Sequence, residues 1–214
     1  MFTIFEILDI AVMTVVIGFL FKEFFRLAPG KDEDILAHYR SPKRFGFGRD
    51  FWWACAIIAP SLILHELGHK FTGMAFGLQS TFHAACSTAY LAPGGMPVLD
   101  SVCLLSIVMV LLKLAGIGVL FIIPGYVVTQ GATLWQHTLI AAAGPAVHLI
   151  FWLGTAAYMK SSKRMRKLPE RKRMYLVFFR KINMWLFVLN MLPIPILDGW
   201  DVYVTPLLYL FGLR

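Results

Sequence analysis

The chain has 214 residues, of which 58% are hydrophobic and 15% are charged, and its formal net charge is +8. A soluble globular domain is about 45–50% apolar and about 25% charged, so this composition departs from that of a soluble domain in the direction of a bilayer protein. It also excludes a disordered chain, a collagen and a disulfide-rich mini-protein. The basic residues cluster beside apolar runs, so we expect anionic lipid headgroups, and no nucleic acid, as their partners.

The apolar segments predict an all-α membrane protein: a polytopic helical bundle in a single membrane domain. A span over 2–21 follows no basic segment and carries no clean cleavage site, so we expect a retained transmembrane helix and not a signal peptide. Three further spans are expected over 51–77, 134–159 and 174–198. An apolar segment over 202–213 is too short, at about 1.5 Å per residue, to cross a bilayer of about 30 Å.

The first span contains two acidic residues, Glu6 and Asp9, which we expect at the level of the headgroups and not in the interior of the bundle. Between the second and third spans, residues 78–100 are rich in turn formers, and residues 101–128 are apolar but interrupted by Lys113 and several glycines. This pattern is poor for one straight span. It favours a membrane-embedded segment over 78–128 that is re-entrant or partly β and packs against protein.

The three cysteines, Cys55, Cys86 and Cys103, show no spacing typical of a metal site. All three lie in apolar sequence. We therefore expect them to be small, buried hydrophobic residues.

A polar cluster with the pattern H-E-x-x-H lies deep in the second span. His65 and His69 are four residues apart, so on a helix they project from one face. Neutral imidazoles suit Zn²⁺, and the carboxylate of Glu66 follows the first histidine, where it can act as a general base beside the ion. Such polar groups are costly in hydrocarbon unless a metal or partner satisfies them, which favours a functional site.

A catalytic zinc ion takes three protein ligands and keeps one position open. The best third candidate is Asp198, which stands at the end of an apolar span that also contains Pro193 and Pro195. The prolines cannot continue a helix, so we expect an extended stretch there that lines a cavity. The alternative is that Asp198 only caps the next helix.

Three motifs then follow one another along the chain. They are His65-Glu66-Leu67-Gly68-His69, Ala143-Gly144-Pro145, and Asn190-x-x-Pro193-x-Pro195-x-Leu197-Asp198-Gly199. In this order, and in apolar spans, they make the chain resemble the site-2 protease family of intramembrane zinc metalloproteases, over roughly residues 51–200. The sequence departs from the family pattern in three places. Trp200 replaces a small residue, His148 replaces an asparagine or serine, and more apolar sequence separates His69 from Gly144 than in the minimal family members. We expect His148 to pack in the bundle or to line the site.

The resemblance implies one Zn²⁺ per chain, held by His65, His69 and Asp198, with Glu66 as the base. It implies a three-helix catalytic core made of the spans 51–77, 134–159 and 174–198, with a membrane-embedded hairpin between the first two. Asn190, Pro193 and Pro195 are implied to lie against the substrate, although Asn190 could also simply hydrogen-bond between helices.

The function that the resemblance implies is an intramembrane endopeptidase acting on membrane-protein substrates, in a multi-pass protein of a prokaryotic cell membrane. A substrate helix would have to unwind, and the backbone near Pro193–Ile196 or the edge of the 78–128 hairpin could accept it by strand addition. The alternative is a zinc-binding membrane protein without protease activity, chaperone-like or a transporter; a transporter should show inverted repeats, which we do not find. A protease of prenylated proteins would take a later Glu as ligand, and only Glu170 follows Glu66.

The orientation in the membrane stays open at this point. Basic residues concentrate in segments 22–50 and 160–173, and the positive-inside rule places both segments in the cytoplasm. His65 and Asp198 would then lie nearer the opposite face. The family resemblance implies the reverse, with the active site closer to the cytosol.

Overall fold

The computed structural model describes residues 2–25, 47–87, 101–115 and 125–212. Their elements, in chain order, are α1 (Ile4–Phe25), α3 (Arg49–Ile57), α4 (Ala59–Ala75), β1 (Ser80–Ala84), α5 (Ser101–Leu114), β2 (Gly125–Thr129), α6 (Leu134–Met159), α7 (Ser162–Lys167), α8 (Glu170–Asn190), the short π-helical segment η2 (Trp200–Val204) and α9 (Thr205–Leu210). The chain is thus mostly helical with one small sheet, as the predicted fold class requires.

Three of the described helical segments are long and apolar enough to cross a membrane. They are Ile4–Glu23, the α3–α4 segment Arg49–Ala75, and Leu134–Met159. The predicted span 174–198 corresponds to α8, which the same criteria of length and composition do not select. Its first half carries several basic residues, which lower its hydropathy.

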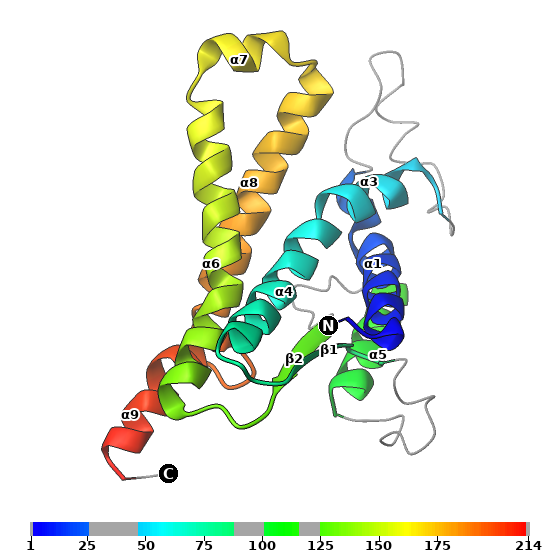
Figure 1. The fold of residues 1–214 in the computed structure, drawn as a ribbon. Helices are drawn as coiled ribbons and strands as arrows, with labels where there is room; N and C mark the ends of the chain where they lie inside the picture. Colours follow the sequence, from blue (N-terminus) through cyan, green and yellow to red (C-terminus); the bar gives the residue numbers. More distant parts are fainter. Residues whose placement is uncertain (1, 26–46, 88–100, 116–124, 213–214) are drawn as a thin grey trace.

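The long helices form two groups that meet at α4 (Figure 1). The helices α6 and α8 run antiparallel and are joined by α7 at one end, while α4 packs against α6 and α1 packs against α3 and β1. Small residues permit the close contact of α4 with α6, because a Cβ at Gly68 would lie 2.9 Å from the Ala143 carbonyl oxygen. The buried core includes Met13 and Ile17 of α1, Ile58 at the α3–α4 junction, and Phe82 of β1.

The two strands, which lie between α4 and α6 in the sequence, form an antiparallel pair that packs against α1 and α4. Ser80 lies opposite Thr129, and Ala84 lies opposite Gly125. Because β1 and β2 pair, the chain between them leaves and returns at the same end of the molecule, where α5 also lies (Figure 1). The 14 residues of α5 extend about 21 Å, less than the roughly 30 Å of a bilayer core. The strand pair, together with a helix too short to cross the bilayer, agrees with the predicted partly β segment between the two spans.

The acidic residues of α1 are buried, so the prediction that they lie among the headgroups was wrong. Glu6 is 3% exposed and accepts hydrogen bonds from Lys70 and, at 2.8 Å, from the backbone N–H of Phe82. Asp9 is fully buried and accepts from the N–H of Ala84 at 3.1 Å and from the Ser87 hydroxyl at 2.5 Å. The two carboxylates therefore accept hydrogen bonds from N–H groups on the outer edge of β1, which would otherwise be unpaired in an apolar environment.

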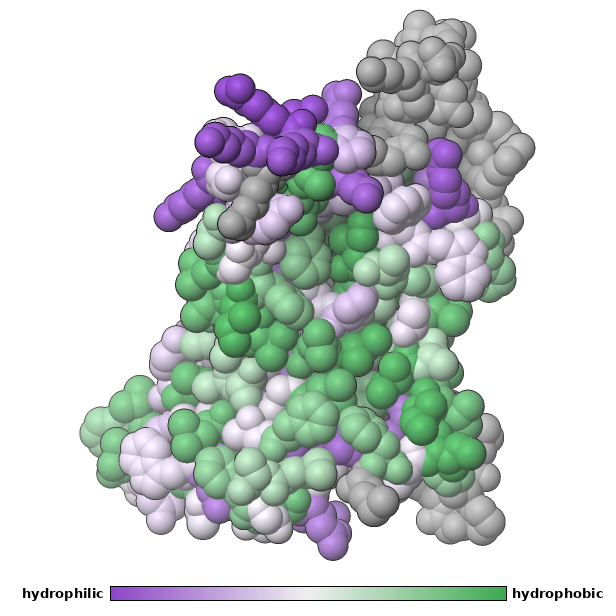
Figure 2. Space-filling model, turned by 45° about the horizontal axis from the view of Figure 1, so that its top comes forward, coloured by the Kyte–Doolittle hydropathy of each residue, from purple (hydrophilic) through white to green (hydrophobic). Residues whose placement is uncertain are grey.

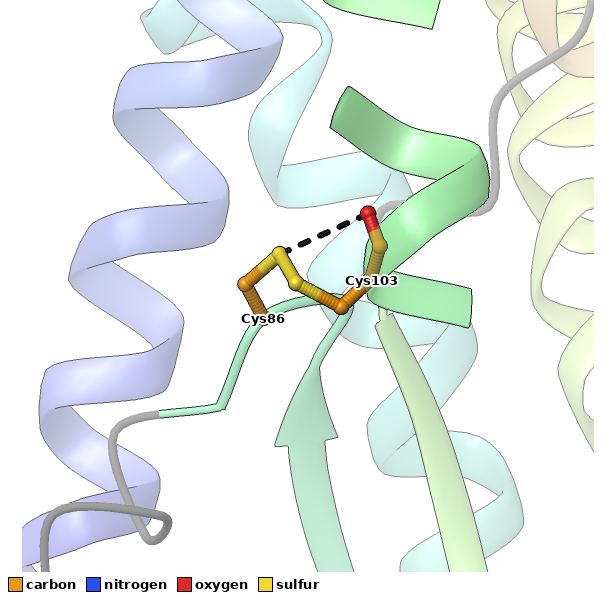
Figure 3. The surroundings of a disulfide bond; sticks show 2 residues. All are labelled: Cys86 and Cys103. Carbon is orange, nitrogen blue, oxygen red and sulfur yellow. Dashed lines mark hydrogen bonds between the residues drawn. A yellow bond between two sulfur atoms is a disulfide. The ribbon is translucent and has the colours of Figure 1, made fainter. Parts of the chain in front are cut away.

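The cysteines differ from the prediction at two of three positions. Cys86 and Cys103 form a disulfide, which ties the residues after β1 to the start of α5 (Figure 3). Their separation of 17 residues follows no recognised pattern, so sequence spacing gave no signal for the bond. Cys55 is free and buried, as expected.

Candidate metal centre

Helix α4 presents both histidines of the H-E-x-x-H motif on one buried face. His65 and His69 are 5% and 7% exposed, and their rings meet edge to face. The two Nε2 atoms lie 3.1 Å apart. The four-residue spacing on a helix therefore brings the two imidazoles to one point, as the sequence predicts.

The third predicted ligand, Asp198, reaches the same point from the turn that follows α8. Its Oδ2 lies 3.2 Å from Nε2 of His65, and its Oδ1 lies 3.3 Å from Nε2 of His69. This turn is not the extended stretch that we predicted. It closes on its own hydrogen bonds, from the N–H of Ile194 to the Leu192 carbonyl and from the N–H of Leu197 to the Ile194 carbonyl.

Local backbone geometry explains how the turn delivers Asp198. Ile196 has φ +88°, a left-handed conformation that a β-branched residue rarely adopts. A Cβ at Gly199 would overlap the backbone of Met191 and Leu192, so only glycine permits this close return of the chain. The prolines end α8, and the tight return after them aims the carboxylate at α4.

The three side chains fit a tetrahedral metal ion. A zinc centre with bonds of about 2.0–2.1 Å separates neighbouring ligand atoms by roughly 3.3 Å. The nearest ligand atoms of the three residues are 3.1, 3.2 and 3.3 Å apart, with Oδ2 of Asp198 facing His65 and Oδ1 facing His69. Two imidazole nitrogens and a carboxylate oxygen are also a donor set that zinc prefers. Helix α6 leaves room for this cluster only because residue 144 is glycine, since a Cβ there would overlap the ring of His69.

The two histidines are held by different means. Nδ1 of His69 lies 2.6 Å from the Ile140 carbonyl oxygen, to which it donates, so Nε2 keeps its lone pair for a metal. Nδ1 of His65 is buried and has no hydrogen-bond partner among the described residues. Instead, the His65 ring stacks on the ring of His148, with centroids 4.6 Å apart and planes inclined by 28°.

His148 is itself fixed by a polar network that links three helices. It is fully buried in α6, and its Nδ1 lies 3.0 Å from Oδ1 of Asn183 in α8. The same oxygen accepts from the Ser61 hydroxyl of α4 at 2.6 Å, while Nδ2 of Asn183 donates to the Phe179 carbonyl. Sequence reasoning missed Ser61 and Asn183; the available signal was the presence of polar residues inside otherwise apolar spans.

Glu66 and Asn190 line the same pocket as the three metal-ligand candidates. The pocket encloses about 240 Å³ and also receives residues of β2. Glu66 is 7% exposed, so the candidate base is shielded from bulk solvent. It lines the pocket together with the two histidines. Pro193 and Pro195 are exposed and do not line this pocket.

The described fold and site define a helical membrane protein with a candidate metal centre of the zinc-metalloprotease type. The chain is similar to two proteins named "Putative zinc metalloprotease Rip2": that of Mycobacterium tuberculosis (strain H37Rv), with 32% identity, and that of Mycolicibacterium smegmatis, with 30% identity, each over 145 residues. The match covers 65% of this chain and 51% of each relative, so the chain spans about half the length of the curated relatives it matches.

No family model matches the chain, and no solved structure matches it significantly. The similarity to proteins that are named as zinc metalloproteases agrees with the resemblance that the three sequence motifs indicate.

Proposed function

We propose that the chain is an intramembrane zinc metalloendopeptidase that hydrolyses peptide bonds within or near transmembrane segments of membrane-protein substrates. The observation that carries the proposal is the convergence of His65, His69 and Asp198 on one point, in a pocket that also contains Glu66. The names of the relatives support a zinc-dependent protease. The surrounding apolar helices support a site inside the membrane.

In this proposal the protein is multi-pass, in the cell membrane of a prokaryote, with the lipid bilayer as its surroundings. The segments α1, α3–α4, α6 and α8 would be its spans, with α4, α6 and α8 as the catalytic core. Two observations support that core: α4 contributes both histidines and packs on α6, and α8 leads directly into the turn that carries Asp198.

The residues would divide the chemistry as follows. His65, His69 and Asp198 would hold one Zn²⁺, which supplies a lowered pKa for a bound water and polarises the scissile carbonyl. Glu66, buried beside them, would accept the proton of the attacking water and donate it to the leaving amine. Asn190 lines the pocket and would hydrogen-bond the substrate backbone.

We propose that the edge of β2 facing away from β1 accepts an unwound substrate. The N–H groups of Phe82 and Ala84 in β1 point to Glu6 and Asp9, so the outer edge of β1 is occupied. By alternation along the antiparallel pair, the backbone groups of Gly125, Val127 and Thr129 point away from β1. Gly125 and Val127 line the pocket that holds the metal-ligand candidates, where strand addition would deliver a peptide.

The test is cleavage of tagged single-span membrane proteins in zinc-loaded proteoliposomes, comparing wild type with Glu66→Gln. Loss of the general base should reduce the rate at least 100-fold. Glu170→Gln is the matched control, because Glu170 is an exposed acidic residue at the start of α8, and it should cleave like wild type. Equal rates in wild type and Glu66→Gln would refute the mechanism. Bound zinc without cleavage in wild type would favour the non-proteolytic alternative.

A further inference from the structure

In the described part of the chain, positive charge gathers at one end. Segment 160–173, which includes α7 and the start of α8, contains eight of the chain's 20 lysine and arginine residues. Lys22 in the last turn of α1 and Arg49 at the start of α3 add to them. The end of α1, the start of α3 and the whole of α7 lie at this end (Figure 1), and strongly hydrophilic residues gather at one end of the space-filling view (Figure 2). We call it the basic end.

The metal-ligand candidates lie toward the other end. His69 stands six residues before the end of α4, a distance of roughly 9 Å along the helix axis. The sheet, α5 and α9 lie at this end as well (Figure 1). Lys70, which follows His69 in α4, is 1% exposed and paired with Glu6, so it adds no surface charge.

The disulfide gives a second and independent observation about this end. Cys86 follows β1 directly, and Cys103 lies in the first turn of α5, so the bond sits beside the sheet that borders the metal-centre pocket (Figure 3). Disulfides form and persist in oxidising compartments and are rare in the cytosol of mesophiles. The end that carries the disulfide is therefore suited to the non-cytoplasmic side of a membrane.

Charge and disulfide chemistry require the same orientation. Lysine and arginine are enriched in cytoplasmic loops, where they meet the anionic leaflet. We infer that the basic end contacts anionic lipid headgroups at the cytoplasmic face, and that His65, His69 and Asp198 lie in the half of the membrane facing away from the cytoplasm. This is the reverse of the orientation that the family resemblance implies. It rests on the multi-pass arrangement of the proposed function but not on protease activity.

The orientation has a consequence for the substrate. A metal centre in that half of the membrane would take its water from the non-cytoplasmic side. The bond cleaved would then lie in the non-cytoplasmic half of the substrate's transmembrane segment. Substrates cut there release their non-cytoplasmic part rather than a cytoplasmic one.

The experiment labels single added cysteines in spheroplasts of a bacterial expression host with a membrane-impermeant maleimide. Gln130→Cys places a thiol on the exposed residue after β2, and Ser162→Cys places one on exposed α7. Wild type is the blank, because Cys86 and Cys103 are bonded and Cys55 is buried. We expect Gln130→Cys to react in intact spheroplasts and Ser162→Cys to react only after permeabilisation.

Labelling of Ser162→Cys in intact spheroplasts, or failure to label Gln130→Cys there, overturns the orientation. A second measurement needs no variant: thiols of wild-type protein are trapped by alkylation in living cells, before and after reduction. We expect Cys86 and Cys103 to be alkylated only after reduction, and two freely alkylated thiols would contradict the inference. Neither measurement depends on cleavage, so a failure here is separate from a failure of the proposed function.

Discussion

His148 shows how a residue that does not touch a metal can set the geometry of one that does. Its ring stacks on His65, and its Nδ1 is tied to Asn183, which is in turn bonded to Ser61. Nδ1 of His69 has a direct partner in the Ile140 carbonyl, whereas Nδ1 of His65 has no hydrogen-bond partner in the part of the chain that the structure describes. The orientation of the His65 ring therefore depends on His148.

Replacing His148 by alanine should weaken metal binding about 10- to 100-fold, the usual effect of losing a group that orients a ligand. Zinc affinity measured by chelator competition checks this prediction. His83→Ala is the control, because His83 lies in β1 and bonds Thr81 and Ser87, away from the centre. The shape of the visible spectrum of the Co²⁺-substituted protein should change in His148→Ala alone. An unchanged affinity and spectrum would show that His148 merely fills space.

Two glycines of α6 provide a matched pair of variants. A Cβ at Gly144 would overlap the His69 ring, whereas a Cβ at Gly154 would have nothing within 4 Å. Gly144→Ala should therefore displace a metal ligand and abolish stoichiometric zinc binding. Gly154→Ala should keep zinc and stabilise the helix by about 0.5–1 kcal/mol. Zinc content and thermal unfolding in detergent measure both effects, and full zinc content in Gly144→Ala would contradict the described packing.

At the scale of elements, α1 acts as a support for the sheet. The buried pair of Glu6 and Lys70 connects α1 to α4, and the same carboxylate holds β1 through Phe82. The α1–β1 contact thus fixes the position of the sheet against the helix that bears both histidines.

Lys70→Met should destabilise the protein by about 3–5 kcal/mol, because it leaves the Glu6 carboxylate buried without its cation. Combining it with Glu6→Gln should recover a large part of this loss, since the amide oxygen can still accept from the N–H of Phe82. Unfolding free energies in detergent form the double-mutant cycle. Losses that simply add would mean that the two residues act independently.

The edge of β2 makes the proposed route of the substrate testable. Val127→Pro removes the N–H that points away from β1, and Val127→Thr keeps it as the matched control. We expect Val127→Pro to raise KM for a membrane-protein substrate at least tenfold while zinc content stays unchanged. Cleavage with wild-type KM in Val127→Pro would exclude pairing at this edge.

For the whole molecule, patterns within short stretches of sequence predicted more than contacts between distant ones. The helical spacing of His65 and His69 and the chain-breaking prolines near Asp198 were sufficient to predict the cluster. The burial of Glu6 was not predictable, because its partners Lys70 and Phe82 lie 64 and 76 residues away. The disulfide likewise depends on the return of α5 beside β1, and the hydrogen-bonded turn at 191–197 depends on packing at Gly199.

Charge, disulfide and metal centre also divide the whole molecule into two chemically different ends. The basic residues at one end are suited to anionic headgroups, and the polar groups at the other end are bonded within the protein. A membrane protein with this division would have one preferred orientation, with the candidate metal centre away from the basic end.

The most direct test of the account is the zinc content per chain of purified wild type, Glu66→Gln and Asp198→Asn, measured by mass spectrometry after removal of loosely bound metal. Asp198→Asn replaces a carboxylate ligand by a weakly ligating amide, while Glu66→Gln leaves all three candidate ligands in place. The account predicts about one zinc in wild type and in Glu66→Gln, and at least a tenfold lower content in Asp198→Asn. Equal zinc content in Asp198→Asn and wild type would contradict it.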